Sequence, residues 1–460
     1  PTLHRPSPAA RPRSMIAALL LAPLLAAPAD VSESADWPGW LGPNRDGRVH
    51  EFAPSADWSQ APTERWRVEV GTGYGSPLVA GERVYLHARQ GEEEVLWRLD
   101  AATGDTVWRR GWAVPFEAQP GGERHGAGPK ASPLLADGRV FTHSITGTVR
   151  AWDAETGEPL WSRKPADRFA PGRPNWGASG SPAFDPNTGP HGAVIVHLGN
   201  DDAGALTAFD ARTGETLWEL VGDGASYSSP VVTEIDGVRQ VVAWTHEAVL
   251  GVDAATGAEL WRSSLPHVGG DQNMPTPTIH DGTVIVGAEN RGVRALRPTR
   301  SANPEAASGW TVEELWHTEA AALDMSTGVI CDGLLYGFSH LRSGQLFALD
   351  PATGELLWST RGREGANGTL LSLPPTAGEE EGRVLVLKDD GTLLVLAARG
   401  AETEILATHR VAAGQTWAPA APLPDGLLVK DLDTLRRLSF DRPEDGGTKT
   451  ERREAGDRRR

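Results

Sequence analysis

The segment Asp-Ala-Ala-Thr-Gly-Asp-Thr-Val-Trp at residues 100–108 is the first of five copies of one nine-residue pattern, Asp-x-x-Thr-Gly-x-x-x-Trp. The conserved positions of the five copies are Asp100, Gly104, Trp108, Asp153, Gly157, Trp161, Asp210, Gly214, Trp218, Asp253, Gly257, Trp261, Asp350, Gly354 and Trp358. A degenerate sixth copy keeps Leu315-Trp316, and a seventh near residues 405–406 has lost its Trp. Self-similarity of this kind indicates a repeat architecture.

Each copy has the composition of a β-hairpin. Residues 95–99 form an apolar run, residues 100–104 carry turn residues, and residues 106–108 return as a second strand. In such a turn the Asp accepts hydrogen bonds from nearby backbone amides, and the Gly supplies a positive φ. A second hairpin, often opened by Ser-Pro, precedes each copy, so each repeat contains four antiparallel strands.

The spacing of the Trp residues identifies the architecture. Trp66 and Trp108 are 42 residues apart, as are Trp316 and Trp358. Four-stranded units of about 40–45 residues are typical of propeller blades, and a Trp ring suits the gap between neighbouring sheets. We therefore predict an all-β, eight-bladed β-propeller of four-stranded antiparallel blades, closed by an amino-terminal outer strand at residues 66–70. A seven-bladed ring and two half-domains are the alternatives.

The chain divides into four predicted regions. Residues 1–29 combine a basic head, an apolar core and an Ala-Pro-Ala end, which predicts a cleaved signal peptide and a periplasmic or secreted protein. Residues 30–60 are expected to form a linker and a segment that packs Trp37 and Trp40 on the propeller rim. The propeller is predicted at 61–440 and a disordered, charged tail at 441–460. No Cys lies near the cleavage site, so we expect no lipid attachment there.

Composition excludes several classes of protein. The chain has 61 acidic and 44 basic residues, a net charge of −17, which disfavours nucleic-acid binding. Its single Cys rules out an internal disulfide or a Cys-rich zinc site. We expect no transmembrane segment in the mature chain and a monomeric state.

The repeated pattern resembles the pyrroloquinoline-quinone-type (PQQ-like) propeller repeat of quinoprotein dehydrogenases and of BamB-like outer-membrane assembly proteins. The sequence Trp-Pro-Gly-Trp-Leu-Gly-Pro-Asn-Arg-Asp-Gly at residues 37–47 is similar to the leader of exported members. Two features of these families are missing. Quinoprotein alcohol dehydrogenases carry a pair of adjacent cysteines and a calcium site, whereas Cys331 is alone and no calcium motif is found. BamB-like proteins carry a lipidated amino-terminal Cys, which has no counterpart here.

Candidate site residues lie in the loops that connect each outer strand to the next innermost strand, because these loops gather around the channel mouth of a propeller. The candidate ligand-binding residues are Tyr74, His125, Lys130, Asn175, Trp176, Tyr227, Gln272, Asn273, Asp324, Asn367 and Trp417. We find no His-Glu-x-x-His, Gly-x-Ser-x-Gly or phosphate-loop motif, so no catalytic residue and no metal site are predicted.

These observations favour a non-enzymatic scaffold that binds a protein partner, in envelope or outer-membrane protein assembly, with no cofactor. One alternative is a PQQ-dependent alcohol or sugar dehydrogenase that lacks the vicinal disulfide and uses PQQ with calcium. Another is a glycan-binding propeller in which Trp176, Tyr227 and Trp417 are stacking platforms.

Overall fold

The computed structural model describes residues 36–50, 52, 58–120, 122–269, 271–301, 309–375, 380–398 and 402–440. The predicted signal peptide, residues 30–35 of the predicted linker and the predicted charged tail lie outside the described residues. The described part holds 32 strands in eight four-stranded sheets, with three short 3-10 helices, η1 (Glu123–His125), η2 (Pro165–Asp167) and η3 (Leu341–Ser343). None of its helices has the length and apolarity needed to cross a bilayer.

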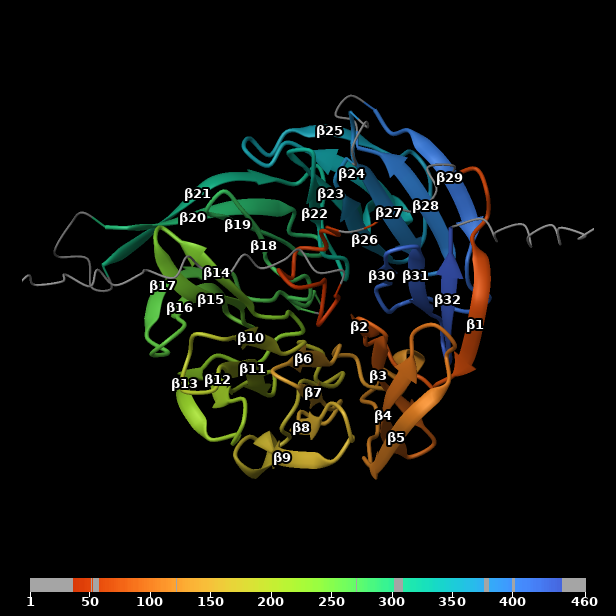
Figure 1. Ribbon diagram of the computed structural model, residues 1–460. Coiled ribbons are helices and arrows are strands. Elements are labelled where there is room, and N and C mark those ends of the chain that lie inside the picture. Colours follow the sequence, from red (N-terminus) through yellow and green to blue (C-terminus); the bar gives the residue numbers. More distant parts are fainter. Residues whose placement is uncertain are drawn as a thin grey trace, which may run out of the picture. The chain divides into compact units, whose positions relative to one another are not determined.

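Each sheet is one blade, whose first strand lies at the hub and whose last strand lies at the periphery (Figure 1). Blade 1 contains β2 (Leu78–Ala80), β3 (Arg83–Gln90), β4 (Glu93–Asp100) and β5 (Thr106–Ala113). Blade 2 contains β6 (Leu134–Ala136), β7 (Arg139–His143), β8 (Val149–Asp153) and β9 (Pro159–Arg163). Blade 3 contains β10 (Ala183–Asp185), β11 (Ala193–Gly199), β12 (Gly204–Asp210) and β13 (Thr216–Gly222). Blade 4 contains β14 (Val231–Ile235), β15 (Val238–Trp244), β16 (Ala248–Asp253) and β17 (Glu259–Ser264).

The remaining blades repeat this order. Blade 5 contains β18 (Thr278–His280), β19 (Thr283–Gly287), β20 (Val293–Arg300) and β21 (Trp310–Thr318). Blade 6 contains β22 (Val329–Cys331), β23 (Leu334–Ser339), β24 (Gln345–Leu349) and β25 (Leu356–Ser359). Blade 7 contains β26 (Gly368–Leu373), β27 (Arg383–Lys388), β28 (Thr392–Ala397) and β29 (Ile405–Arg410). Blade 8 contains β30 (Ala421–Leu423), β31 (Gly426–Lys430), β32 (Thr434–Ser439) and β1 (Thr63–Glu69).

The ring is closed in blade 8 by strands from both ends of the propeller. β1 pairs antiparallel with β32, in a register that runs from Thr63–Ser439 to Glu69–Thr434. Figure 1 shows β1, drawn in orange, beside β32, drawn in blue. The predicted eight-bladed fold and its closure by an amino-terminal outer strand are therefore confirmed, and neither alternative count is observed.

The repeated Asp and Gly build one type of turn between the third and fourth strands. In blade 1, Asp100 Oδ1 accepts hydrogen bonds from the amides of Ala102 and Thr103, both at 2.9 Å. Gly104 follows with φ +77°, a left-handed conformation that favours glycine. The turns at Asp153, Asp210 and Asp253 have the same pair of hydrogen bonds.

The repeated Trp contacts this turn in the next blade, an interaction we name the indole–turn contact. In five places the indole Nε1 donates at 2.8–3.1 Å to a carbonyl one or two residues after the turn Asp: Trp66 to Ala101, Trp108 to Glu155, Trp161 to Ala211, Trp218 to Ala254 and Trp316 to Pro351. The ring also covers the turn Gly, so that a Cβ added to Gly257 would lie 2.8 Å from Trp218. The predicted filling of the gap between sheets by Trp is thus accompanied by a directed hydrogen bond.

The amino-terminal segment at residues 36–49 lies in the hub, which corrects the predicted position on the rim. The Trp37 amide donates to Val79 O of β2 at 2.8 Å, and Pro38 O accepts from Leu135 N of β6 at 2.7 Å. In blade 7, which is separated from blade 1 by blade 8, Ser372 O of β26 accepts a hydrogen bond from Val49 N at 2.9 Å. Figure 1 shows this segment in red among the innermost strands. The innermost strand of each blade has backbone N–H and C=O groups that face the hub, where no further blade strand pairs with them among the described residues. The amino-terminal segment supplies hydrogen-bond partners for some of these groups.

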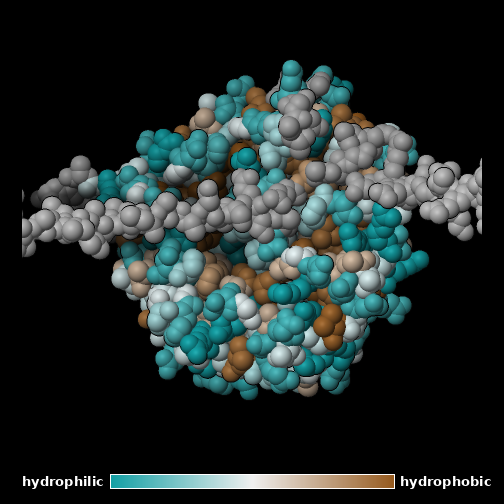
Figure 2. Space-filling model, in the orientation of Figure 1, coloured by the Kyte–Doolittle hydropathy of each residue, from teal (hydrophilic) through white to brown (hydrophobic). Residues whose placement is uncertain are grey.

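The outermost strand of every blade has a free edge, since no further strand pairs with it among the described residues. Several of these strands also expose an apolar side chain, with exposed fractions of 53% for Val107, 46% for Leu160, 57% for Val221 and 48% for Ile405. On the face drawn in Figure 2, hydrophobic residues form small, separated patches among hydrophilic ones. The free strand edges, with these exposed apolar side chains, are therefore candidate binding surfaces.

Trp218→Ala should lower the free energy of unfolding by about 3–5 kcal/mol, because it opens a cavity between two blades and removes the bond to Ala254 O. Leu160→Ala is the control, since this outer-strand side chain is 46% exposed and its loss should cost under about 1 kcal/mol. Chemical denaturation measures both. Equal destabilisation by the two variants would contradict the role assigned to the indole.

Gly257→Ala should lower the stability of the fold more than Gly237→Ala does, although both glycines have positive φ, +76° and +70°. Left-handed strain of about 1–3 kcal/mol is common to both variants. Only the Cβ at residue 257 meets the Trp218 ring, whereas the Cβ at residue 237 meets nothing within 4 Å. The difference between the two melting midpoints isolates the indole–turn contact, and identical midpoints would show that backbone strain alone selects glycine.

Candidate functional site

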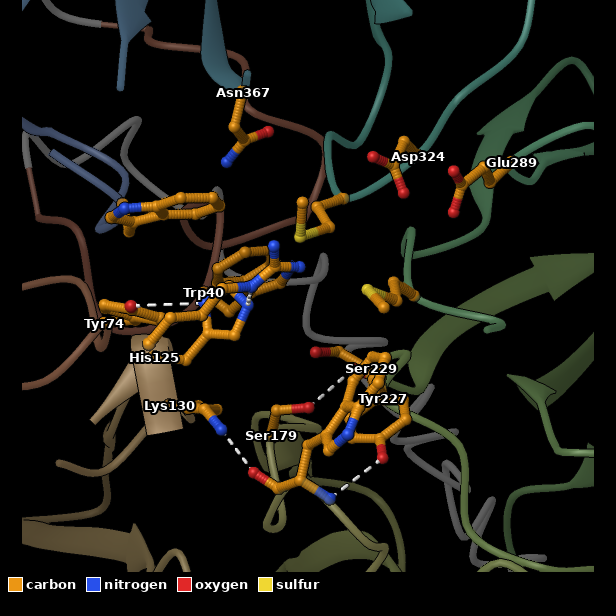
Figure 3. Close-up of a pocket in the computed structure, with 15 residues that line it drawn as sticks. Trp40, Tyr74, His125, Lys130, Ser179, Tyr227, Ser229, Glu289, Asp324 and Asn367 are labelled. Atoms are coloured by element: carbon orange, nitrogen blue, oxygen red, sulfur yellow. Dashed lines mark hydrogen bonds between the residues drawn. The ribbon is translucent and has the colours of Figure 1, made fainter. Parts of the chain in front are cut away.

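A cavity of about 250 Å³ opens at the hub, among the loops that precede the innermost strands (Figure 3). Its lining residues are Trp40, Tyr74, Arg124, His125, Lys130, Trp176, Ser179, Tyr227, Ser229, Met274, Glu289, Asp324, Met325, Asn367 and Trp417. Trp40 belongs to the hub segment, and its Nε1 donates to Thr276 Oγ1 at 2.9 Å. The hub segment thus supplies one wall of the cavity.

Eight of the eleven candidate ligand-binding residues line this cavity, namely Tyr74, His125, Lys130, Trp176, Tyr227, Asp324, Asn367 and Trp417. The other three do not. The backbone N–H of Asn175 donates to Asp201 Oδ2 at 3.3 Å, and Gln272 Oε1 lies 3.2 Å from His246 Nε2. Asn273 is fully buried, and its Nδ2 donates to Thr245 O at 2.8 Å. Their polar groups therefore support loops.

The sequence analysis missed other lining residues, among them Trp40 and Glu289. Glu289 follows β19, in the turn between the second and third strands of blade 5. In an antiparallel blade this turn emerges on the same face as the loop that enters the first strand. Including these second-to-third-strand turns would have identified Glu289, whereas Trp40 carried no signal because its segment lies outside the repeats.

Basic groups occupy one side of the cavity. Burial and the charge of Arg173 lower the pKa of Lys130 to about 8, and its ammonium donates to Trp176 O. Burial, Lys130 and Arg124 together lower the pKa of His125 to about 4, so the ring is neutral at pH 7. Arg124 Nε donates to His125 Nε2 at 3.0 Å, which leaves the ring proton on Nδ1, 3.4 Å from Tyr74 Oη.

Acidic groups occupy another side. Burial, followed by the charges of Glu289 and Asp271, raises the pKa of Asp324 to about 7. Figure 3 shows the carboxyl groups of Asp324 and Glu289 next to each other. Within the described part of the chain, no group of three or more His, Cys, Asp or Glu side chains is arranged to hold a metal ion.

Aromatic rings cover much of the remaining wall, and they pack on one another. Tyr74 stacks on Trp417 with ring centroids 5.5 Å apart and an interplanar angle of 21°. Trp176 tilts over Tyr227 at 5.9 Å, and its backbone amide donates to Tyr227 Oη at 3.2 Å. Burial raises the pKa of Tyr74 to about 12, so its hydroxyl keeps its proton at pH 7. The site can therefore offer a hydroxyl donor, apolar ring faces and charges of both signs.

Three curated relatives illustrate the range of functions among similar proteins. The chain is 29% identical to tetrathionate hydrolase of Acidithiobacillus ferrooxidans over 52% of this chain and 46% of that protein. It is 28% identical to outer membrane protein assembly factor BamB of Yersinia pestis over 55% of this chain and 62% of that protein. It is 23% identical to polyvinylalcohol dehydrogenase of a Pseudomonas species over 86% and 61%. The chain thus spans only about half to two thirds of the length of these relatives.

Solved structures share the fold at low identity. BamB from Moraxella catarrhalis superposes with a TM-score of 0.56 and 15% identity, over 83% of this chain and 98% of that one. Quinohemoprotein alcohol dehydrogenase from Comamonas testosteroni superposes with a TM-score of 0.61 and 15% identity, over 91% of this chain and 83% of that one. The family model described as outer membrane protein assembly factor BamB matches residues 59–115, 92–340 and 306–417. Because these matches cover more than half of the chain, the protein belongs to the BamB family of PQQ-like β-propellers.

Proposed function

We propose that the protein acts outside the cytoplasm as a non-enzymatic scaffold in the assembly of outer-membrane proteins. The observation that carries this proposal is the family match, which extends over seven of the eight blades. The sequence at residues 1–29, which has the composition of a signal peptide, supports an exported location. The net charge of −17 is compatible with a protein partner and unfavourable for nucleic acid.

The free outer edges provide a physical means of binding such a partner. An extended segment can add to an exposed edge through backbone hydrogen bonds, while its alternate side chains contact apolar residues on that edge. Val107 on β5 and Val221 on β13 are both more than half exposed. Strands of outer-membrane barrels alternate apolar and polar residues, which is the pattern that strand addition accommodates.

The residues of the hub cavity do not fit PQQ with calcium, so we derive no oxidation from it. A calcium ion takes six to eight oxygen ligands, whereas the described residues place only two acidic side chains together at the cavity. Tyr74 already stacks on Trp417 and Trp176 packs on Tyr227, so one face of each of these rings is covered by the protein itself.

A photo-crosslinking amino acid at Val107 or Val221, in the organism that carries the protein, should capture a component or client of the outer-membrane assembly machinery. These positions lie on free strand edges with exposed fractions of 53% and 57%. The same amino acid at Asp281, whose side chain is 89% exposed in a turn away from the outer edges, is the matched control. Mass spectrometry identifies the products. Equal products from all three positions, or none from the strand edges, would overturn the proposal.

A further inference from the structure

The acidic side of the hub cavity holds polar groups that have no hydrogen-bond partner among the residues that the structure describes. Among the described residues, neither the Asp324 nor the Glu289 carboxylate forms a hydrogen bond or an ion pair. Asn367 as a residue is only 5% exposed, and its side-chain amide has no hydrogen bond within the described part of the chain. Figure 3 shows Asn367 directed into the cavity on the side of Asp324. A side-chain amide that borders a cavity and has no protein partner is available to bind a ligand there.

The charges around Asp324 show what this side would attract. Burial, followed by the charges of Glu289 and Asp271, raises the pKa of Asp324 to about 7, and Arg124 only partly opposes this rise. Two carboxylates that repel each other gain stability when a cation arrives between them. Because the described part of the chain brings only two acidic side chains together here, an organic ammonium group is satisfied more readily than a divalent metal ion.

The remaining lining residues indicate which other chemical groups a ligand of this cavity would carry. Met274 and Met325 line the wall with Trp40, and their thioethers and indole suit an aliphatic body. On the basic side, the Lys130 ammonium donates one hydrogen bond to Trp176 O and keeps two further N–H donors. Arg124, which is exposed, lies on the same side. A ligand with only a positive or only a negative charge would leave one of these sides uncompensated.

We propose that the hub cavity binds a zwitterionic ligand of the amino-acid or short-peptide class. Its ammonium group lies against Asp324 and Glu289 and receives further help from the Asn367 amide oxygen. Its carboxylate lies toward Lys130 and Arg124. This site is separate from the outer strand edges of the proposed scaffold function, so either proposal can fail without the other.

Three probes of one length test the proposal on the purified full chain: 6-aminohexanoate, hexylamine and hexanoate. The fluorescence of the lining Trp residues and calorimetry both report binding. We expect 6-aminohexanoate to bind with Kd of about 1 mM or tighter and at least about tenfold better than either single-charge probe. Equal affinities for the three probes, no saturable binding of any of them, or saturable binding of PQQ with calcium would overturn the proposal.

Variants distinguish the acidic side from the remainder of the cavity. Asp324→Asn keeps the side-chain volume and should weaken the binding of 6-aminohexanoate by about tenfold or more, while the affinity for hexanoate should change little. Glu289→Gln should act in the same direction, and thermal melting verifies that both variants are folded. Asp281→Asn, at an exposed turn, is the control and should bind like the wild type. Loss of affinity in the control, or none in the two cavity variants, contradicts the assignment.

The affinity should follow a bell-shaped dependence on pH. The ligand ammonium favours ionised Asp324, so its pKa of about 7 falls on binding, a proton is released, and affinity rises through pH 7. Lys130 faces Arg173 and His125 and has a pKa of about 8, so its attraction for the carboxylate weakens above that pH. We expect affinity about tenfold lower at pH 6 than at its maximum. A profile that is flat from pH 6 to 7.5, or that is unchanged in Asp324→Asn, would contradict the role of this carboxyl.

Discussion

The contact of one indole ring with the turn of the next blade is the interaction on which the ring depends. It joins the two most characteristic elements of the repeat, because the Trp of one copy covers the Gly of the next and donates to a neighbouring carbonyl. Each contact crosses a blade boundary, so a blade gains this stabilisation only when its neighbour is folded. The residues of the repeated pattern therefore stabilise the association of neighbouring blades as well as the hairpin itself.

The boundary between blades 4 and 5 lacks the indole–turn contact, because one of its two partners is missing. Blade 5 has no Asp-x-x-Thr-Gly turn, and Trp261 Nε1 donates instead to Gln240 Oε1 of its own blade at 2.6 Å. The ring remains 3% exposed, and its cluster includes Trp310 at the start of the long strand β21. Packing can thus replace the turn contact, provided that the outer hairpin is extended and a second aromatic ring fills the space.

The repeat made the blade number, the ring closure and most of the cavity predictable. Tyr74, Asp324 and Asn367 occupy equivalent loops, so a period found in the sequence brings them to one place. Trp40 and the hub segment have no equivalent positions, and their contacts with blades 1, 2 and 7 join residues far apart in the sequence. Likewise, whether an amide such as that of Asn273 faces a cavity or a backbone carbonyl depends on side-chain direction, which the pattern does not encode.

The hub and the periphery can carry different functions because the blades separate them. The four strands of a blade lie roughly 5 Å apart, so about 15 Å of packed sheet lies between a ligand in the hub and the edge of an outer strand. Evolution can therefore change the loops around Asp324 without disturbing Val107 or the indole–turn contacts. The proteins to which this chain is similar include a hydrolase, an assembly factor and a dehydrogenase, which agrees with different functions being carried by separate sites on one architecture.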